Sequence, residues 1–139
     1  MAITQTWTTS FKQQVLLGVH DLDTDVLKIA LYTPSANLGA DTTIYSPTNE
    51  VSGPGYTEGG QILTNVTVSA GNGVAYVDFD NPNWPGSSFT TLGALIYNSS
   101  KQNKSMFVLN FGTDQTTVNA TFQIIMPANN PTFAVIRLD

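Results

Sequence analysis

The sequence contains no cysteine among its 139 residues. That absence excludes disulfide bonds, thiolate nucleophiles and every metal site built on cysteine. Charged side chains are also scarce, at 11% of the chain, against about 25% in an average soluble protein. Five lysines and arginines stand against ten aspartates and glutamates, so the formal net charge is −5. Because nucleic acids and anionic membranes bind through clustered basic side chains, we expect neither as a partner.

Long hydrophobic runs are missing as well. No apolar stretch approaches the roughly 18 residues that a membrane helix needs. The opening stretch, MAITQTWTTS, lacks the basic start and the apolar centre of a secretory signal. We therefore expect a soluble protein.

The residues that are abundant favour β-structure. Hydrophobic residues make up 41% of the chain, and its polarity comes mainly from uncharged Thr, Asn, Ser and Gln. The segment GNG at 71–73 accepts positive φ and predicts a hairpin, and the polar segment NSSKQNK at 98–104 predicts a second one. Strands are predicted at residues 26–33, 61–69, 74–80, 89–97, 105–111, 118–126 and 132–138.

One short helix is predicted at residues 11–17. Ser10 and Gln13 match a capping box, apolar residues follow at helical spacing, and Gly18 can end the helix. With about seven strands and no βαβ spacing, the chain is predicted to be all-β. We expect one domain, residues 1–139, forming an antiparallel β-sandwich or barrel, jelly-roll-like or Ig-like, with one short N-terminal helix.

A glycine cluster, EVSGPGYTEGG, closes the longest irregular region, residues 34–60. A phosphate-binding loop would need a following helix and a lysine, whereas Gln61 opens a predicted strand. We interpret the cluster as a structural loop in which Tyr56 packs its ring and hydrogen-bonds its hydroxyl. The residues assigned to positive φ or close backbone approach are Gly53, Gly55, Gly59 and Gly60.

An acidic run, Asp21, Asp23 and Asp25, superficially suggests calcium. An EF-hand loop counted from Asp21 needs glycine and glutamate where the chain has Val26 and Tyr32, so the match fails. We interpret the run as a solvated turn, and a looser calcium site near these three carboxylates stays an open alternative.

Catalytic signals are weak. His20 is the only histidine, and no serine stands in a nucleophile-elbow context. Glu50 and Glu58 could form a carboxylate pair for glycoside cleavage, but they lie in one loop and nothing fixes their separation. We predict no enzyme, no catalytic residue, no cofactor and no bound metal.

Aromatic residues supply the interface candidates. Trp7 lies in an otherwise polar N-terminal stretch, so residues 1–9 are predicted to form a docking arm. Trp84 lies in NPNWPG, predicted as a loop with an exposed ring. The interface candidates are Trp7, Phe11, Tyr56 and Trp84.

Several motifs in order resemble one family. They are FKQQVLLGVHDL, LKIALYT, a loop with TTIY, and EVSGPGYTEGGQIL, followed by predicted hairpins. In this order the chain resembles small structural proteins of tailed bacteriophages. The resemblance implies a virion component, leaves capsid or tail open, and carries no catalytic residues.

These observations favour a capsid decoration (cement) protein. We expect it to be made in the host cytoplasm and to sit on the capsid surface of the virion, as a homotrimer bound to the major capsid protein. The alternative is a tail-associated carbohydrate- or receptor-binding module that uses Trp84 and the loop tyrosines. A small hydrolase is a third, weaker alternative.

Overall fold

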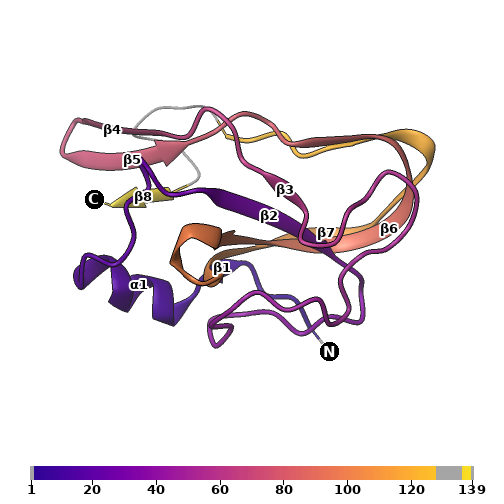
Figure 1. The fold of residues 1–139 in the computed structure, drawn as a ribbon, viewed down its shortest axis with the longest axis horizontal. Helices are drawn as coiled ribbons and strands as arrows, with labels where there is room; N and C mark the ends of the chain where they lie inside the picture. The colour runs from indigo at the N-terminus through magenta and orange to yellow at the C-terminus, as the bar shows by residue number, and fades with distance from the viewer. Residues whose placement is uncertain (1, 128–135, 139) are drawn as a thin grey trace.

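The computed structural model describes residues 2–127 and 136–138. It confirms the predicted fold class, an antiparallel all-β sandwich with one short helix near the N-terminus (Figure 1). The elements are β1 (Thr6–Trp7), α1 (Thr9–Leu16), β2 (Leu27–Tyr32), β3 (Gln61–Ile62), β4 (Thr67–Gly71), β5 (Val74–Asp78), β6 (Asn83–Asn98), the 3₁₀ turn η1 (Ser99–Lys101), β7 (Lys104–Gln123) and β8 (Ile136–Leu138).

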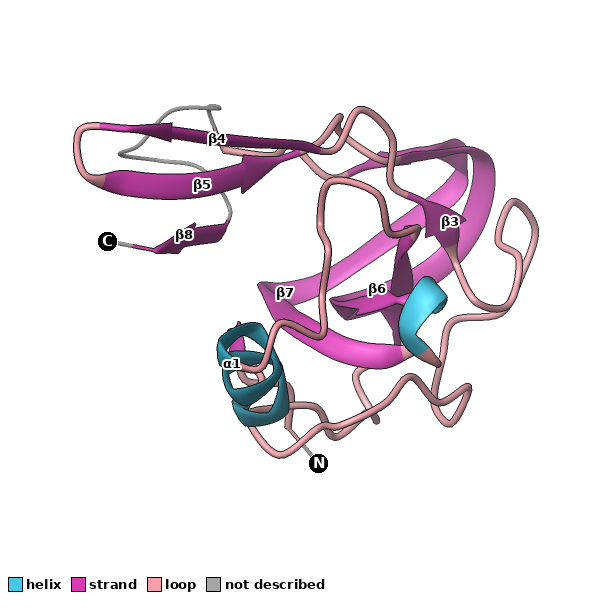
Figure 2. Cartoon of the chain, turned by 60° about the vertical axis from the view of Figure 1, so that its left-hand side comes forward, coloured by secondary structure: helices cyan, strands magenta, loops and turns pink. Residues whose placement is uncertain are grey.

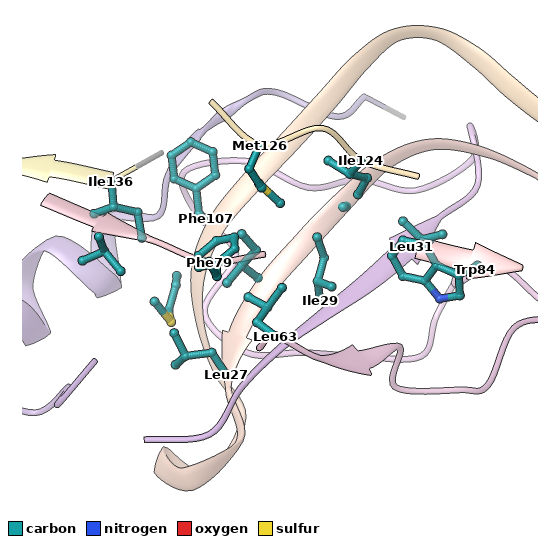
Figure 3. Packing of buried hydrophobic residues seen from close by; sticks show 14 of the residues in the cluster. Leu27, Ile29, Leu31, Leu63, Phe79, Trp84, Phe107, Ile124, Met126 and Ile136 are labelled. Atoms are coloured by element: carbon teal, nitrogen blue, oxygen red, sulfur yellow. The ribbon is translucent and has the colours of Figure 1, made fainter. Parts of the chain in front are cut away.

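The strands form two sheets that share one core. The larger sheet has the order β1-β7-β6-β2-β3, and the smaller has the order β4-β5-β8. Ile29 and Leu31 of the larger sheet and Ile136 of the smaller one are buried in the same cluster, with Phe79 and Met126 (Figure 3). The core therefore lies between the sheets, as in a sandwich.

The larger sheet is also buried on its second face. Ala30, Tyr32 and Leu95 pack there against Ile3 and Leu38, which come from the N-terminal segment and the long irregular region. Burial on both faces explains why β2 is apolar along nearly its whole length and does not alternate. The irregular region is thus a packed cover for the sheet.

Helix α1 forms where the sequence predicted it but begins earlier. Thr8, not Ser10, is the N-cap, and its side chain accepts the backbone N–H of Phe11. Gly18 ends the helix at φ +73°, and the N–H of Val19 bonds back to the carbonyl of Gln14, which completes a Schellman motif. The predicted stop is confirmed, and the predicted capping box is wrong.

The two hairpins are confirmed, but the strands differ from prediction. The GNG turn joins β4 to β5, and η1 joins β6 to β7. The predicted strand 61–69 is split into β3 and β4. Segments 105–111 and 118–126 were predicted as separate strands, but β7 runs unbroken through most of both. For the predicted strand 132–138, only Ile136–Leu138 lie within the described residues.

In the strand predicted at 118–126, residues alternate between two faces with Val118, Ile124 and Met126 on the same face, and this pattern is wrong at its start. Val118 is 79% exposed, whereas Ile124 and Met126 are buried. Asn119 adopts φ +51°, and the β6–β7 pairing shifts register nearby, between Ser87 and Phe89. Such an irregularity changes which face successive side chains occupy, so one period-two pattern cannot extend across it.

The N-terminal segment is part of the domain and not a free arm. Thr6 and Trp7 pair with Val108 and Phe107 on the edge of β7, and Ile3 is buried. The prediction that this segment lies outside the strands is therefore wrong. Its polar composition concealed the pairing, because an edge strand uses backbone groups that every residue carries.

Candidate functional site

The glycine-rich loop is organised around the carboxylate of Glu50. This group accepts hydrogen bonds from the Tyr45 hydroxyl (2.6 Å), the backbone N–H of Gly59 (2.8 Å) and the Tyr56 hydroxyl. The Tyr56 hydroxyl in turn accepts the backbone N–H of Leu31 at 2.9 Å. Burial, reinforced by Glu50, raises the pKa of both Tyr45 and Tyr56 far above the ordinary range, so both remain protonated donors.

This arrangement gives Glu50 a structural role. Its oxygens are occupied by tyrosine and backbone donors, while Glu58 is exposed on the same loop. Burial and the Glu50 charge also raise the pKa of Tyr97 to about 12. The Tyr97 hydroxyl donates to the carbonyl of Gly59 (2.6 Å), which ties the loop to β6.

The glycines of the loop are required by close backbone contact. The predicted positive φ is confirmed at all four positions, Gly53, Gly55, Gly59 and Gly60. A Cβ at Gly60 would lie 1.8 Å from the carbonyl oxygen of Ile29, and one at Gly55 would lie 2.7 Å from the Cα of Ser87. The loop is therefore a fixed connection pressed against β2 and β6.

His20 joins α1 to the β6–η1 turn. Its Nε2 lies 2.8 Å from Gln14 Oε1, and its Nδ1 lies 3.0 Å from Asn98 Nδ2. Asn98 Nδ2 also donates to Asp25, and Asn98 Oδ1 accepts the N–H of Ser100, so the amide orientation is fixed. Nδ1 is then the acceptor and Nε2–H the donor.

The same surroundings keep His20 uncharged. Burial lowers the pKa of His20 below its ordinary 6.5, against a smaller opposing effect of the Asp25 charge. A neutral imidazole with both nitrogens engaged serves as a structural link and has no free nitrogen to act as a general base.

The acidic run forms a turn closed by its own backbone. Asp21 Oδ1 accepts the N–H of Asp23 (3.2 Å), and Asp25 pairs with Lys101 Nζ at 2.9 Å. Burial favours a raised pKa for Asp25, but hydrogen bonds led by those from Asn98 and Lys101 hold its pKa below 3.8. Among the residues that the structure describes, no three His, Cys, Asp or Glu side chains gather as metal ligands.

An open apolar groove lies between α1 and the smaller sheet; we call it the α1 groove. Its volume is about 460 Å³. Figure 2 shows α1 facing the side of that sheet that carries β8. Apolar residues from both sides form most of its walls: Trp7, Phe11, Val15, Val68, Ile136 and Leu138.

The α1 groove combines a buried floor with exposed apolar walls. Phe11 is almost fully buried and contacts both Trp7 and His20 edge-on, at centroid distances of 5.5 and 5.0 Å. Val68 and Leu138 on the opposite wall are 49% and 50% exposed. A groove of this kind can receive apolar side chains of a partner and remove both surfaces from water.

The structure separates the four predicted interface residues. Trp7 and Phe11 lie together in the α1 groove. Trp84 is on β6 and only 4% exposed, packed between Tyr56 and Phe122, so its predicted place in an exposed loop is wrong. Tyr56 is half-buried, with its hydroxyl engaged by Glu50. The prolines and glycine around Trp84 suggested a loop, but β6 begins at Asn83 and contains Pro85 and Gly86.

Sequence reasoning missed the wall opposite Trp7. Val68 and Leu138 belong to segments that the sequence correctly indicated as β-structure. Alternation shows which residues share a face, but it does not show whether that face is covered. Only the placement of α1 against the smaller sheet reveals the groove.

A second hollow, of about 860 Å³, lies on the irregular region and has both polar and apolar walls. Asn37, Thr42, Thr43, Thr48 and Asn49 are among its lining residues, together with Tyr32, whose ring is buried.

In the described part of the chain no helix has the length and apolarity to cross a membrane. Comparisons with protein-family models, curated proteins and solved structures gave no match.

Proposed function

We propose that this chain is a tailed-phage virion protein that decorates and stabilises the outer capsid shell, with the major capsid protein as its partner. The observation that carries the proposal is the α1 groove, which gathers apolar side chains around Trp7 on a weakly charged molecule. Tryptophan in a partly covered pocket is the residue type most often found at energetic centres of protein interfaces.

Charge supports a position on the outside of the particle. The net charge of −5 comes with only five lysines and arginines, so the chain would be repelled by packaged nucleic acid. The proposed state is a homotrimer, because closed symmetry lets a small β-domain contact several capsid subunits at once. Binding to the assembled shell and not to free subunits stabilises the shell by mass action.

Co-sedimentation with capsids tests this function. Particles that lack the protein are mixed with the wild-type chain, with Val68→Gln or with Val118→Gln, and then sedimented. Wild type and Val118→Gln should pellet with capsids in equal amount, because Val118 lies on β7, outside the groove. Val68→Gln should bind about tenfold more weakly. The Val68 side chain is 49% exposed in the free chain, and the substitution removes this apolar surface from the interface with the partner.

The alternative function is a tail-associated receptor- or carbohydrate-binding module. The second hollow, on the irregular region, favours it, because the hydroxyl and amide side chains in its lining can hydrogen-bond sugar hydroxyls. The burial of Trp84 removes the ring on which the sugar was expected to stack. Binding to isolated tails or to a cell-surface glycan, with no binding to capsids, would replace the decoration proposal by this one.

A further inference from the structure

The end of α1 has few contacts with the rest of the chain. Phe11, in its first turn, is buried, but Leu16 and Leu17 at its end are exposed and bury little apolar surface. Among the described residues, the bond between His20 and Asn98 is the only hydrogen bond that joins residues 11–24 to either sheet. A segment with so few attachments opens at a low free-energy cost once one of them is lost.

Protonation of His20 removes this hydrogen bond. Neutral His20 accepts the Asn98 amide at Nδ1, whereas the protonated ring donates from both nitrogens. Asn98 cannot turn its oxygen toward the ring without losing two other bonds, because Nδ2 donates to Asp25 (2.7 Å) and Oδ1 accepts the N–H of Ser100 (3.0 Å). Two donors would then face each other at a fully buried amide, so an attraction becomes a repulsion.

Charged groups from three neighbouring elements and from its own loop determine when His20 takes up a proton. They are Asp25 before β2, Lys101 in η1, Lys104 at the start of β7, and Asp21 and Asp23 in the loop. Burial has the largest effect and lowers the pKa of His20 below 6.5; the Asp25 charge opposes this effect, and the two lysines add to it. His20 is therefore neutral at neutral pH and becomes charged under mildly acidic conditions.

His20 also belongs to the α1 groove. It is one of the lining residues, and its ring packs edge-on against Phe11, which packs edge-on against Trp7. A displaced His20 ring therefore changes the packing of the groove floor. A charged ring also costs more to cover with apolar groups than a neutral one, so a partner seated in the groove favours neutral His20.

We propose that His20 is an acid-sensitive link between α1 and β6 that controls the α1 groove. Neutral His20 holds the end of the helix against the sheet and keeps the groove formed. Protonated His20 releases the end of the helix and weakens binding in the groove. That the partner is the capsid protein rests on the proposed function, whereas the release of the helix end does not.

NMR spectra of the wild-type chain between about pH 7.5 and pH 5 follow the link directly. The ring signal of His20 needs no assignment, because the chain has no other histidine. The indole signal of Trp7 should shift with the same midpoint as His20, whereas the indole signal of Trp84, in the core, should stay constant. A spectrum of Trp84→Phe distinguishes the two indole signals.

Backbone order parameters show whether the end of the helix is released. At residues 16–19 they should fall from about 0.85, the value of a rigid backbone, to below about 0.6 as His20 becomes charged. Those of β2 should not change. His20→Gln keeps a side chain that donates and accepts hydrogen bonds but does not titrate, so it should show neither change.

Three results would overturn the inference. One is a His20 ring that stays neutral down to about pH 5. Another is a constant Trp7 signal with constant order parameters while His20 takes up its proton. The third is the same pH dependence in His20→Gln as in the wild-type chain.

Pelleting with capsids tests the consequence for binding. Wild type should bind about three- to tenfold more weakly at about pH 5.5 than at about pH 7.5, and His20→Gln should show a ratio close to one. If the helix end is released but the chain pellets with capsids at neither pH, the link stands and the decoration function is rejected. If the chain pellets equally well at both pH values, the decoration function stands and control of binding by His20 is rejected.

Discussion

At the residue scale, the carboxylate of Glu50 organises the local structure of the irregular region. Its carboxylate is the common acceptor for two tyrosine hydroxyls and one backbone N–H, from three places in the irregular region. The sequence offered Glu50 and Glu58 as a carboxylate pair without fixing their separation, because it shows which groups can ionise but not which donors surround them. The glycines, by contrast, were predicted correctly, because positive φ and close approach depend on the missing side chain itself.

Replacing Glu50 with glutamine tests its role. Glutamine offers one acceptor oxygen and turns an NH₂ group toward the donors, so at least one of them loses its partner. Glu50→Gln should lower the free energy of unfolding by about 1–3 kcal/mol, measured by urea denaturation. Glu58→Gln, in the exposed part of the same loop, is the control and should change it by less than about 0.5 kcal/mol.

His20 makes stability depend on pH. Its pKa in the folded chain lies below 6.5, so as pH falls the unfolded chain takes up this proton first. The stability that neutral His20 contributes is complete above about pH 6.5 and is lost as pH falls toward the pKa of His20 in the folded chain. The stability that the Asp25 carboxylate contributes is lost only at lower pH, because the pKa of Asp25 is held below 3.8.

Melting temperatures measured between about pH 7.5 and pH 5 separate these effects. This range is about as wide as the titration of one histidine. Wild type should become less stable over this range, and His20→Gln should show a flatter profile. An unchanged slope in the variant would mean that another group causes the loss.

At the scale of elements, β6 and β7 show where sequence reasoning reached its limit. Strands were predicted at 89–97, 105–111 and 118–126, so the stretch of β7 at residues 112–117 was missed. The second half of β7 is mostly exposed threonine, asparagine and glutamine, and within the described residues it pairs only with β6. No hydrophobic pattern marks residues 112–117, because they bury little surface and are held to β6 by backbone hydrogen bonds and threonine side-chain contacts.

The N-terminal segment leads to a second stability prediction. Removing residues 1–7 would take away β1 and the buried side chain of Ile3, and would uncover apolar groups around Phe11. We expect the free energy of unfolding to fall by about 4 kcal/mol, which lowers the melting temperature by roughly 14 °C. A truncated chain that melts like the full-length chain would show that the segment is an independent arm after all.

At the scale of the whole molecule, the fold class followed from simple rules, while the arrangement of the two sheets did not. Alternating strands, the two hairpin turns and the absence of βαβ spacing were sufficient for an all-β assignment. The α1 groove depends on the placement of Trp7, Val68 and Leu138 around one hollow, although they are far apart in sequence. No local pattern encodes that meeting, so the candidate site was only half predicted, through Trp7 and Phe11.

The central claim is that the chain stabilises a capsid shell, and the temperature at which capsids release their DNA tests it most directly. Particles lacking the protein are heated alone, with the wild-type chain, and with Val68→Gln. We predict that the wild-type chain raises the release temperature until its sites are saturated and that Val68→Gln needs about tenfold more protein for the same effect. A release temperature that stays the same at saturating wild-type protein would contradict the claim.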